Sequence, residues 1–182
     1  MNKGQQHPSN QVYEAFIVNA FLELMQTKES SKITITEICD QAQISRRTYY
    51  RHFDKKEDII ECYATQMMQA LTERLQEPFR CGDIYAFAGT FFAYFAECTK
   101  ELQQITQNGY GDIIFTCYLK CLLPLGYMKP AEASVQSMIV NQTECSVAYT
   151  LGGLWSLLTY WMSHGCVQTP EELAEIVVSR RL

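Results

Sequence analysis

The chain has 182 residues, with 15 Lys and Arg against 20 Asp and Glu, and therefore a formal net charge of −5. Its 47% hydrophobic content, with only 9 Gly and 5 Pro, excludes a disordered, collagen-like or low-complexity protein, and its length allows one or two domains with a sizeable core. The modest acidity argues against a protein that coats nucleic acid over its whole surface, but it is compatible with a local basic patch.

Targeting and redox signals favour the cytoplasm. The first ten residues are polar, with no signal-peptide pattern behind them. The uncharged stretch between Glu144 and Glu171 has its densest apolar part at 149–162, which is shorter than the ~20 residues that a bilayer crossing needs. The cysteines stand singly, without the CxxC pairs of zinc or redox sites or the spacing of a secreted disulfide scaffold. We therefore expect a cytoplasmic protein without a membrane partner.

Apolar residues recur at helical spacing along the chain, and no convincing strand pattern appears. The sequence therefore predicts an all-α fold. A capping box at 34–37, a cap at Ser45 and a second capping box at 54–57 mark three helix starts, and Pro78 is expected to end the third of these helices. The expected helices are 12–25, 35–41, 46–52, a long one up to Pro78, 84–102, 111–123, 131–164 and a last one that opens at Thr169 and Pro170.

Two short helices joined by residues 42–45 have the dimensions of a helix-turn-helix, whose second helix enters the DNA major groove. Five basic residues lie between Ser45 and Lys56 against the single acidic Asp54, so this window carries +4 and the rest of the chain −9. Such a concentration attracts phosphates, and Arg can also bond to the edge of guanine. The alternative for a short basic run is a solvated helix face, but the flanking caps favour DNA binding.

The run TITEICDQAQISRRTYYRHFDKKEDII, from Thr34 to Ile60, resembles the signature of the TetR family of bacterial transcriptional regulators. A weaker likeness to one subgroup of that family extends over 151–173. The resemblance implies an all-α homodimer with a ligand-binding C-terminal domain, which leaves its operator when ligand binds. Gln43 departs from the family pattern, which commonly has Gly in the turn, and a positive φ is uncommon for Gln.

The resemblance also implies which residues contact DNA. We expect a helix-turn-helix domain at 9–58 and a helical effector-binding and dimerisation domain at 59–182. Tyr49 and Phe53 occupy positions that the family usually buries. The positions that match the family's DNA contacts are Thr34, Thr36, Arg46, Arg47, Thr48 and Tyr50 toward bases or the groove wall, and Arg51, His52 and Lys56 toward phosphates.

Aromatic residues are dense between Tyr85 and Phe95, too dense for one core-facing stripe of a helix. Burial in a thickly packed bundle explains any single one of them. As a group they are also typical of an apolar effector pocket in which a few phenolic hydroxyls orient the ligand. The candidate ligand-binding residues are Met67, Phe87, Phe91, Phe95, Tyr110, Phe115 and Tyr118.

A heptad seam follows the last long helix, where apolar residues alternate in steps of four and three. Further apolar residues extend around that helix, so it has two faces to bury. We expect its own domain on one side and a symmetry mate on the other, because a two-fold operator needs a two-fold protein. The alternative is a central helix buried wholly within one chain. The candidate dimer-interface residues are Val147, Leu151, Leu154, Trp155, Leu158 and Trp161.

The leading prediction is a dimeric regulator, a repressor that is released from a palindromic DNA operator by a small apolar effector. One alternative is redox sensing, because Cys117 and Cys121 share a helical face, although core packing is the favoured interpretation of both. Another is a C-terminal domain that docks a partner protein. No nucleophile, metal or phosphate-loop motif occurs, so we expect neither an enzyme nor a cofactor or metal site. The sequence leaves the operator, the effector and the sign of regulation open.

Overall fold

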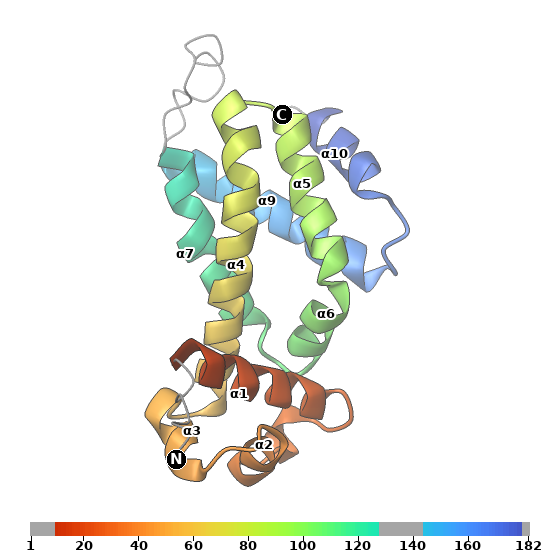
Figure 1. Ribbon diagram of the computed structural model, residues 1–182. Helices are drawn as coiled ribbons and strands as arrows, with labels where there is room; N and C mark the ends of the chain where they lie inside the picture. Colours follow the sequence, from red (N-terminus) through yellow and green to blue (C-terminus); the bar gives the residue numbers. More distant parts are fainter. Residues whose placement is uncertain (1–9, 128–143, 180–182) are drawn as a thin grey trace, which may run out of the picture.

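The computed structural model describes residues 10–127 and 144–179, and within these ranges it contains helices and no strand, as the all-α prediction requires (Figure 1). None of the described helices is both long and apolar enough to cross a membrane. The elements are α1 (Asn10–Met25), η1 (Ser30–Lys32), α2 (Ile35–Gln41), α3 (Arg46–His52), α4 (Lys56–Cys81), α5 (Ile84–Glu97), α6 (Thr99–Gln107), α7 (Gly111–Leu122), η2 (Leu123–Tyr127), α9 (Glu144–Ser163) and α10 (Pro170–Ser179).

The three N-terminal helices form one end of the molecule, and α4 leads away from them into the C-terminal bundle (Figure 1). In that bundle α4 packs against α5 and α7, while α10 packs along α5. Helix α9 contacts α7 and η2, and its Trp161 ring meets Phe92 of α5 edge to face. The buried apolar side chains of both ends form one continuous cluster, so the DNA-binding end is not joined to the bundle by α4 alone.

Helix starts follow the sequence closely, with one correction. The capping box at α2 is present as predicted, because the Thr34 hydroxyl accepts from the Glu37 N–H while the Glu37 carboxylate accepts from the Thr34 N–H. At α4 the side chain that reaches back is Asp58, which accepts from the backbone N–H groups of residues 54 and 55. The predicted box at 54–57 is therefore one residue out of register.

Two predicted boundaries in the bundle are wrong. Helix α4 continues past Pro78 to Cys81, because proline removes only one backbone bond near the helix end and Gly82, at φ 66°, makes the actual stop. The predicted helix 84–102 is two helices, since Cys98 leaves the helical conformation between α5 and α6. Of the predicted helix 131–164, residues 131–143 lie outside the described part of the chain.

The heptad seam of α9 packs inside its own chain. Leu158 is fully buried, and the other leucines of the seam are at most 5% exposed. Trp155 is half-buried between the rings of Phe115 and Tyr118. The interface prediction is therefore corrected for Val147, Leu151, Leu154, Leu158 and Trp161, all buried in the single chain. The seam faces inward, where aromatic side chains of α5 and α7 contact the tryptophans of α9.

Candidate nucleic-acid interface

The turn between α2 and α3 sets the angle of the second helix. Gln43 lies at φ 54°, so this position has the positive φ that the family's usual glycine adopts freely. The Ile44 N–H donates to the Cys39 carbonyl at 2.9 Å, which closes the end of α2 across the turn. Ser45 then caps α3, since its hydroxyl accepts from the Thr48 N–H at 3.1 Å. The helix-turn-helix expected from the sequence is thus complete.

Helix α3 carries its positive charge on the outside. Arg46, Arg47 and Arg51 are all exposed. A hydrogen bond to Tyr50 raises the pKa of Arg46, and the Arg51 guanidinium lies 5.5 Å from the centre of the Tyr13 ring. Within the described residues Arg47 makes no hydrogen bond or ion pair, so its guanidinium can reach an outside partner.

The opposite face of α3 anchors it to the domain. Tyr49 is fully buried and Phe53 nearly so, at the positions that the resemblance assigns to the core. Burial raises the pKa of the Tyr49 hydroxyl well above its usual range. Thr48 is half-buried, and its hydroxyl lies 3.0 Å from that of Ser45, so this side chain takes part in the cap.

The start of α2 presents two threonines and one strongly acidic carboxyl group. Thr34 and Thr36 are exposed, as DNA contacts would need to be. The Glu37 carboxylate accepts a hydrogen bond from Lys28 at 2.7 Å and from the backbone of Thr34, and these bonds lower the pKa of Glu37 to about 2. Glu37 is therefore ionised at neutral pH, and its hydrogen bonds tie Lys28 and Thr34 together in front of α2.

Two residues expected to hold phosphate are turned inward instead. The His52 side chain is only 3% exposed, with its ring against Tyr13 and Nδ1 3.5 Å from a carboxylate oxygen of Glu14. The Lys56 ammonium donates to the carbonyls of Ser30, at 2.5 Å, and Ile33, at 2.9 Å. The Lys56 ammonium therefore has its partners within the domain, whereas the buried Nε2 of His52 has no hydrogen-bond partner among the described residues. The phosphate assignment of these two residues is corrected.

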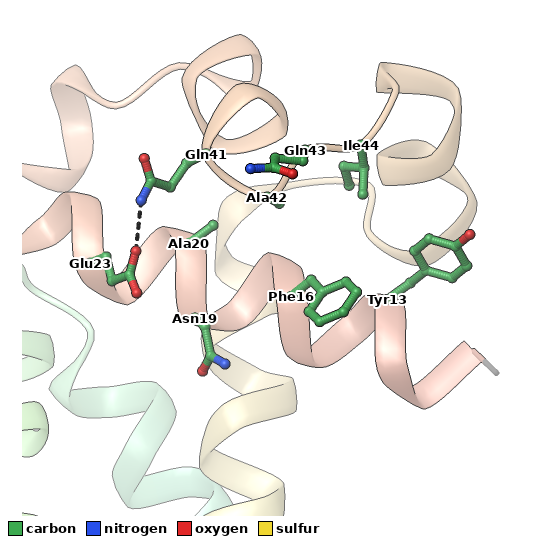
Figure 2. A pocket seen from close by; sticks show the side chains of 9 residues that line it. All are labelled: Tyr13, Phe16, Asn19, Ala20, Glu23, Gln41, Ala42, Gln43 and Ile44. Carbon is green, nitrogen blue, oxygen red and sulfur yellow. Dashed lines mark hydrogen bonds between the residues drawn. The ribbon is translucent and has the colours of Figure 1, made fainter. Parts of the chain in front are cut away.

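An open groove of about 380 Å³ runs between α1 and the α2–α3 turn (Figure 2). The Gln41 amide donates to the Glu23 carboxylate at 2.7 Å at one end of it. Phe16 is 46% exposed on its wall. Sequence reasoning missed this groove because its lining comes from two separate elements, α1 and the α2–α3 turn, and because Phe16 fits the apolar spacing of the first helix, where burial is expected. The lining residues are Tyr13, Phe16, Asn19, Ala20, Glu23, Gln41, Ala42, Gln43 and Ile44.

The candidate effector residues are mostly packed against one another. Phe91 and Phe95 are fully buried with ring centres 4.9 Å apart, and the Tyr118 hydroxyl donates to the Leu151 carbonyl at 2.9 Å. Burial raises the pKa of Tyr118 strongly. The remaining candidates differ: Met67 and Tyr110 are buried, whereas Phe87 and Phe115 are half-buried.

A second open groove, of about 310 Å³, lies between α4 and α7. Its lining combines apolar surface with charged groups and includes the 3.3 Å ion pair between Lys120 and Glu61. Cys117 is the only candidate of the sequence analysis among its lining residues, and neither groove includes a residue of the predicted effector set. The structure therefore exposes the three arginines of α3 with Thr34, Thr36 and Tyr50, whereas most of the effector candidates are buried.

Comparisons with known proteins support the helix-turn-helix. Residues 17–62 match the model of the bacterial regulatory proteins of the tetR family. The HTH-type transcriptional regulator AlkX of Mycobacterium tuberculosis is 29% identical over 88 residues, which are 47% of this chain and 42% of that protein. The match thus spans less than half the length of this curated relative.

The whole fold has a counterpart among solved structures. The fatty acid degradation regulator FadR from Bacillus halodurans superimposes with a TM-score of 0.62, over 98% of this chain and 95% of that one, at 17% sequence identity. All of these matches are regulatory proteins. The chain thus contains a helix-turn-helix domain of the tetR-family type at residues 17–62, with an exposed basic α3, and it is similar to DNA-binding transcriptional regulators.

Proposed function

We propose that the chain is a dimeric repressor that binds a palindromic operator through α3 and leaves it when a small apolar effector binds the C-terminal domain. The observation that carries the DNA contact is the set of three exposed arginines on α3, in a window of +4 on a chain of −5. Because attraction for phosphate is concentrated there, α3 meets the duplex before any other part of the described surface.

We assign the base-specific DNA contacts to the first turn of α3. The N-terminal residues of a recognition helix meet base edges, and Arg47 is exposed with its guanidinium unengaged. An arginine can bond to both O6 and N7 of guanine, which distinguishes that base from the others. Thr34, Thr36 and Tyr50 are also exposed and would contact the backbone or the groove wall.

The replacement Arg47→Ala tests this assignment. We expect it to lose about 1–3 kcal/mol of binding to a duplex that the protein has selected from a random-sequence pool, and to relax the preference at one position of each half-site. Arg80→Ala is the matched control, since Arg80 is an equally exposed arginine at the far end of α4. Equal weakening on the selected and on a scrambled duplex would contradict a base contact by Arg47.

The second copy is assigned to the outward face of α9. Tyr149 and Tyr160 are 73% and 60% exposed there, and no formally charged residue occurs between Glu144 and Glu171. Among the described residues, no atom lies within 4 Å of where a Cβ would stand on Gly152 or Gly153, so another backbone can approach closely. An uncharged face with large exposed rings is typical of a surface covered in an assembly.

The effector is assigned to the aromatic cluster of α5, α7 and α9. Phe115 and Trp155 are half-buried with ring centres 5.3 Å apart, so the cluster reaches the surface at these two rings. The chain shares its fold with a regulator of fatty acid degradation, and fatty acids are therefore the first probes. Phe115→Ala should abolish release of the duplex by an active probe and keep DNA binding, whereas equal loss of both would make the cluster a core only.

Four of the described thiols do not favour redox sensing. Burial raises the pKa of Cys39, Cys62, Cys98 and Cys121, which reduces the reactive thiolate at neutral pH. Peroxide treatment should accordingly leave the affinity for the selected duplex unchanged. A reversible loss of binding that dithiothreitol restores would favour the redox alternative.

A further inference from the structure

The short helix η1 between α1 and α2 depends on side chains from elsewhere. The first N–H groups of any helix have no partner within it. Glu29, the N-cap of η1, pairs with the exposed Lys32 ammonium but gives no side-chain cap to the backbone N–H groups, and Ser30 is only 6% exposed, so water has little access to this end. A buried N–H without a partner destabilises the folded state. Its partner must therefore come from another part of the fold.

That partner is Asn108, at the end of α6. The Ser30 N–H donates to the Asn108 Oδ1 at 2.7 Å, over 78 positions of sequence. The other end of the same amide donates to the Gln104 carbonyl at 2.9 Å. This second bond fixes the orientation of the amide, because a flipped amide would direct its NH2 group at the Ser30 N–H. Asn108 thus caps a helix of the DNA-binding end from the C-terminal bundle.

The carbonyl side of η1 is held by α4. Lys56 donates to the carbonyls of Ser30 and Ile33, so η1 is bound by α6 through its N–H and by α4 through its carbonyls. Thr34, the cap of α2, follows directly. Only residues 31–33 separate Ser30, to which Asn108 bonds, from this cap.

A second contact reinforces the first. The Gln104 amide donates to the Leu22 carbonyl of α1 at 3.0 Å, and the Tyr110 ring meets Phe21 at 6.5 Å between centres. These three residues, Gln104, Asn108 and Tyr110, form what we call the α6–α7 corner. In Figure 1 the end of α6 approaches the C-terminal half of α1. The corner joins the two ends of the molecule without passing through α4.

We propose that Asn108 and Gln104 are positioning residues for DNA binding: by capping η1 and bonding to α1, the α6–α7 corner holds α2 and α3 in the orientation that fits the major groove. The proposal rests on the DNA contacts assigned to α3 above. It makes the corner the place where a change in the C-terminal domain alters operator affinity directly. Neither residue touches DNA, because both lie on the side of η1 and α1 that faces the bundle.

Three alanine variants in α6 test the proposal. Asn108→Ala and Gln104→Ala each remove one bond to the DNA-binding end. Gln103→Ala is the matched control. It removes an amide-to-carbonyl hydrogen bond of the same kind, from Gln103 to the Met162 carbonyl at 3.1 Å, but this bond lies within the C-terminal bundle. Asn108→Asp keeps an oxygen that can accept from Ser30. The readouts are the Kd for the selected duplex and the rate of amide hydrogen exchange at residues 29–33.

We expect the Kd to rise about fivefold in Asn108→Ala and in Gln104→Ala, and to stay within about twofold of wild type in Gln103→Ala and Asn108→Asp. Exchange at residues 29–33 should become about tenfold faster in Asn108→Ala alone. If Asn108→Ala binds DNA as Gln103→Ala does, the positioning role is overturned. Should Asn108→Ala fail to fold, the Kd of Gln104→Ala decides in the same way.

Failure of the proposed function is distinguishable from failure of this inference. A wild-type protein that selects no duplex would contradict the DNA contacts of α3. The exchange measurement does not involve DNA and would still decide whether Asn108 caps η1. Exchange at residues 29–33 that is equal in wild type and Asn108→Ala would overturn the cap itself.

Discussion

Gln43 carries a local backbone cost that the fold accepts. Its φ of 54° closes the turn between α2 and α3, a conformation that costs a residue with a Cβ about 1 kcal/mol more than glycine. Gln43→Gly should therefore raise the free energy of unfolding by about that amount, as measured by urea denaturation. Gln69→Gly, in the exposed interior of α4, should lower it by about 1 kcal/mol. Destabilisation by both replacements would show that the Gln43 side chain contributes more than its backbone costs.

Glu37 makes the stability of the DNA-binding end depend on pH. Its pKa is about 2 in the folded chain, against 4.5 ordinarily, because Lys28 and Thr34 donate to the carboxylate. A lowered pKa means that the stabilisation is complete above pH 4.5 and is lost as the pH falls toward 2. Glu37→Gln should flatten the dependence of the unfolding free energy on pH between 5 and 2. Glu175→Gln, at an exposed position of α10, should leave that dependence as in wild type, and an equal effect of both would refute the role of Glu37.

At the scale of elements, Lys56 fixes how α4 meets η1. Its two bonds to carbonyls are charge-assisted, so Lys56→Ala should cost about 1.5–3 kcal/mol of stability. The slope of log K against log salt should stay unchanged, because this ammonium is engaged inside the domain rather than on phosphate. Lys55→Ala is the control. Lys55 is exposed, so its replacement should change the free energy of unfolding by no more than about 0.5 kcal/mol. A smaller salt slope with unaltered stability would restore the phosphate assignment of Lys56.

Element boundaries depended on how local signals compete with tertiary contacts. The caps of α2 and α3 were predicted correctly because the Thr34 and Ser45 hydroxyls bond to N–H groups three residues away. The break at Cys98 was missed, since no glycine or proline marks it and the apolar pattern continues across it. Such a break is set by where α6 must run to reach α1, which is a property of the assembled fold.

For the whole molecule, the two faces of α9 should respond differently to charge. Tyr160→Asp is expected to yield folded monomers, because it brings two like charges together across the proposed two-fold contact. Leu158→Glu should unfold the protomer instead, since Leu158 is fully buried in its own chain. Light scattering distinguishes monomer from dimer, and circular dichroism shows whether the helices are still folded. Tyr85→Asp, at an exposed tyrosine of α5, is the control; a Tyr160→Asp protein that remains dimeric would exclude this face as the interface.

The sequence by itself determined the helical class, the helix-turn-helix and the exposure of the three arginines of α3. These features depend on contacts within a few residues: capping boxes, a 3.6-residue apolar period and charges clustered in one short window. The family signature lies in the same local stretch.

Only the tertiary structure decided which side chains contact residues that are far away in the sequence. The seam of α9 could have faced a second copy, yet the aromatic rings of α5 and α7 bury it within the chain. Lys56 and His52 could have reached phosphate, yet the carbonyls of η1 and the Glu14 carboxylate hold them inside. The cap of Asn108 on Ser30 spans 78 positions, and no local pattern encodes it. A side chain pairs with the nearest group that the fold brings to it, and sequence spacing does not report that distance.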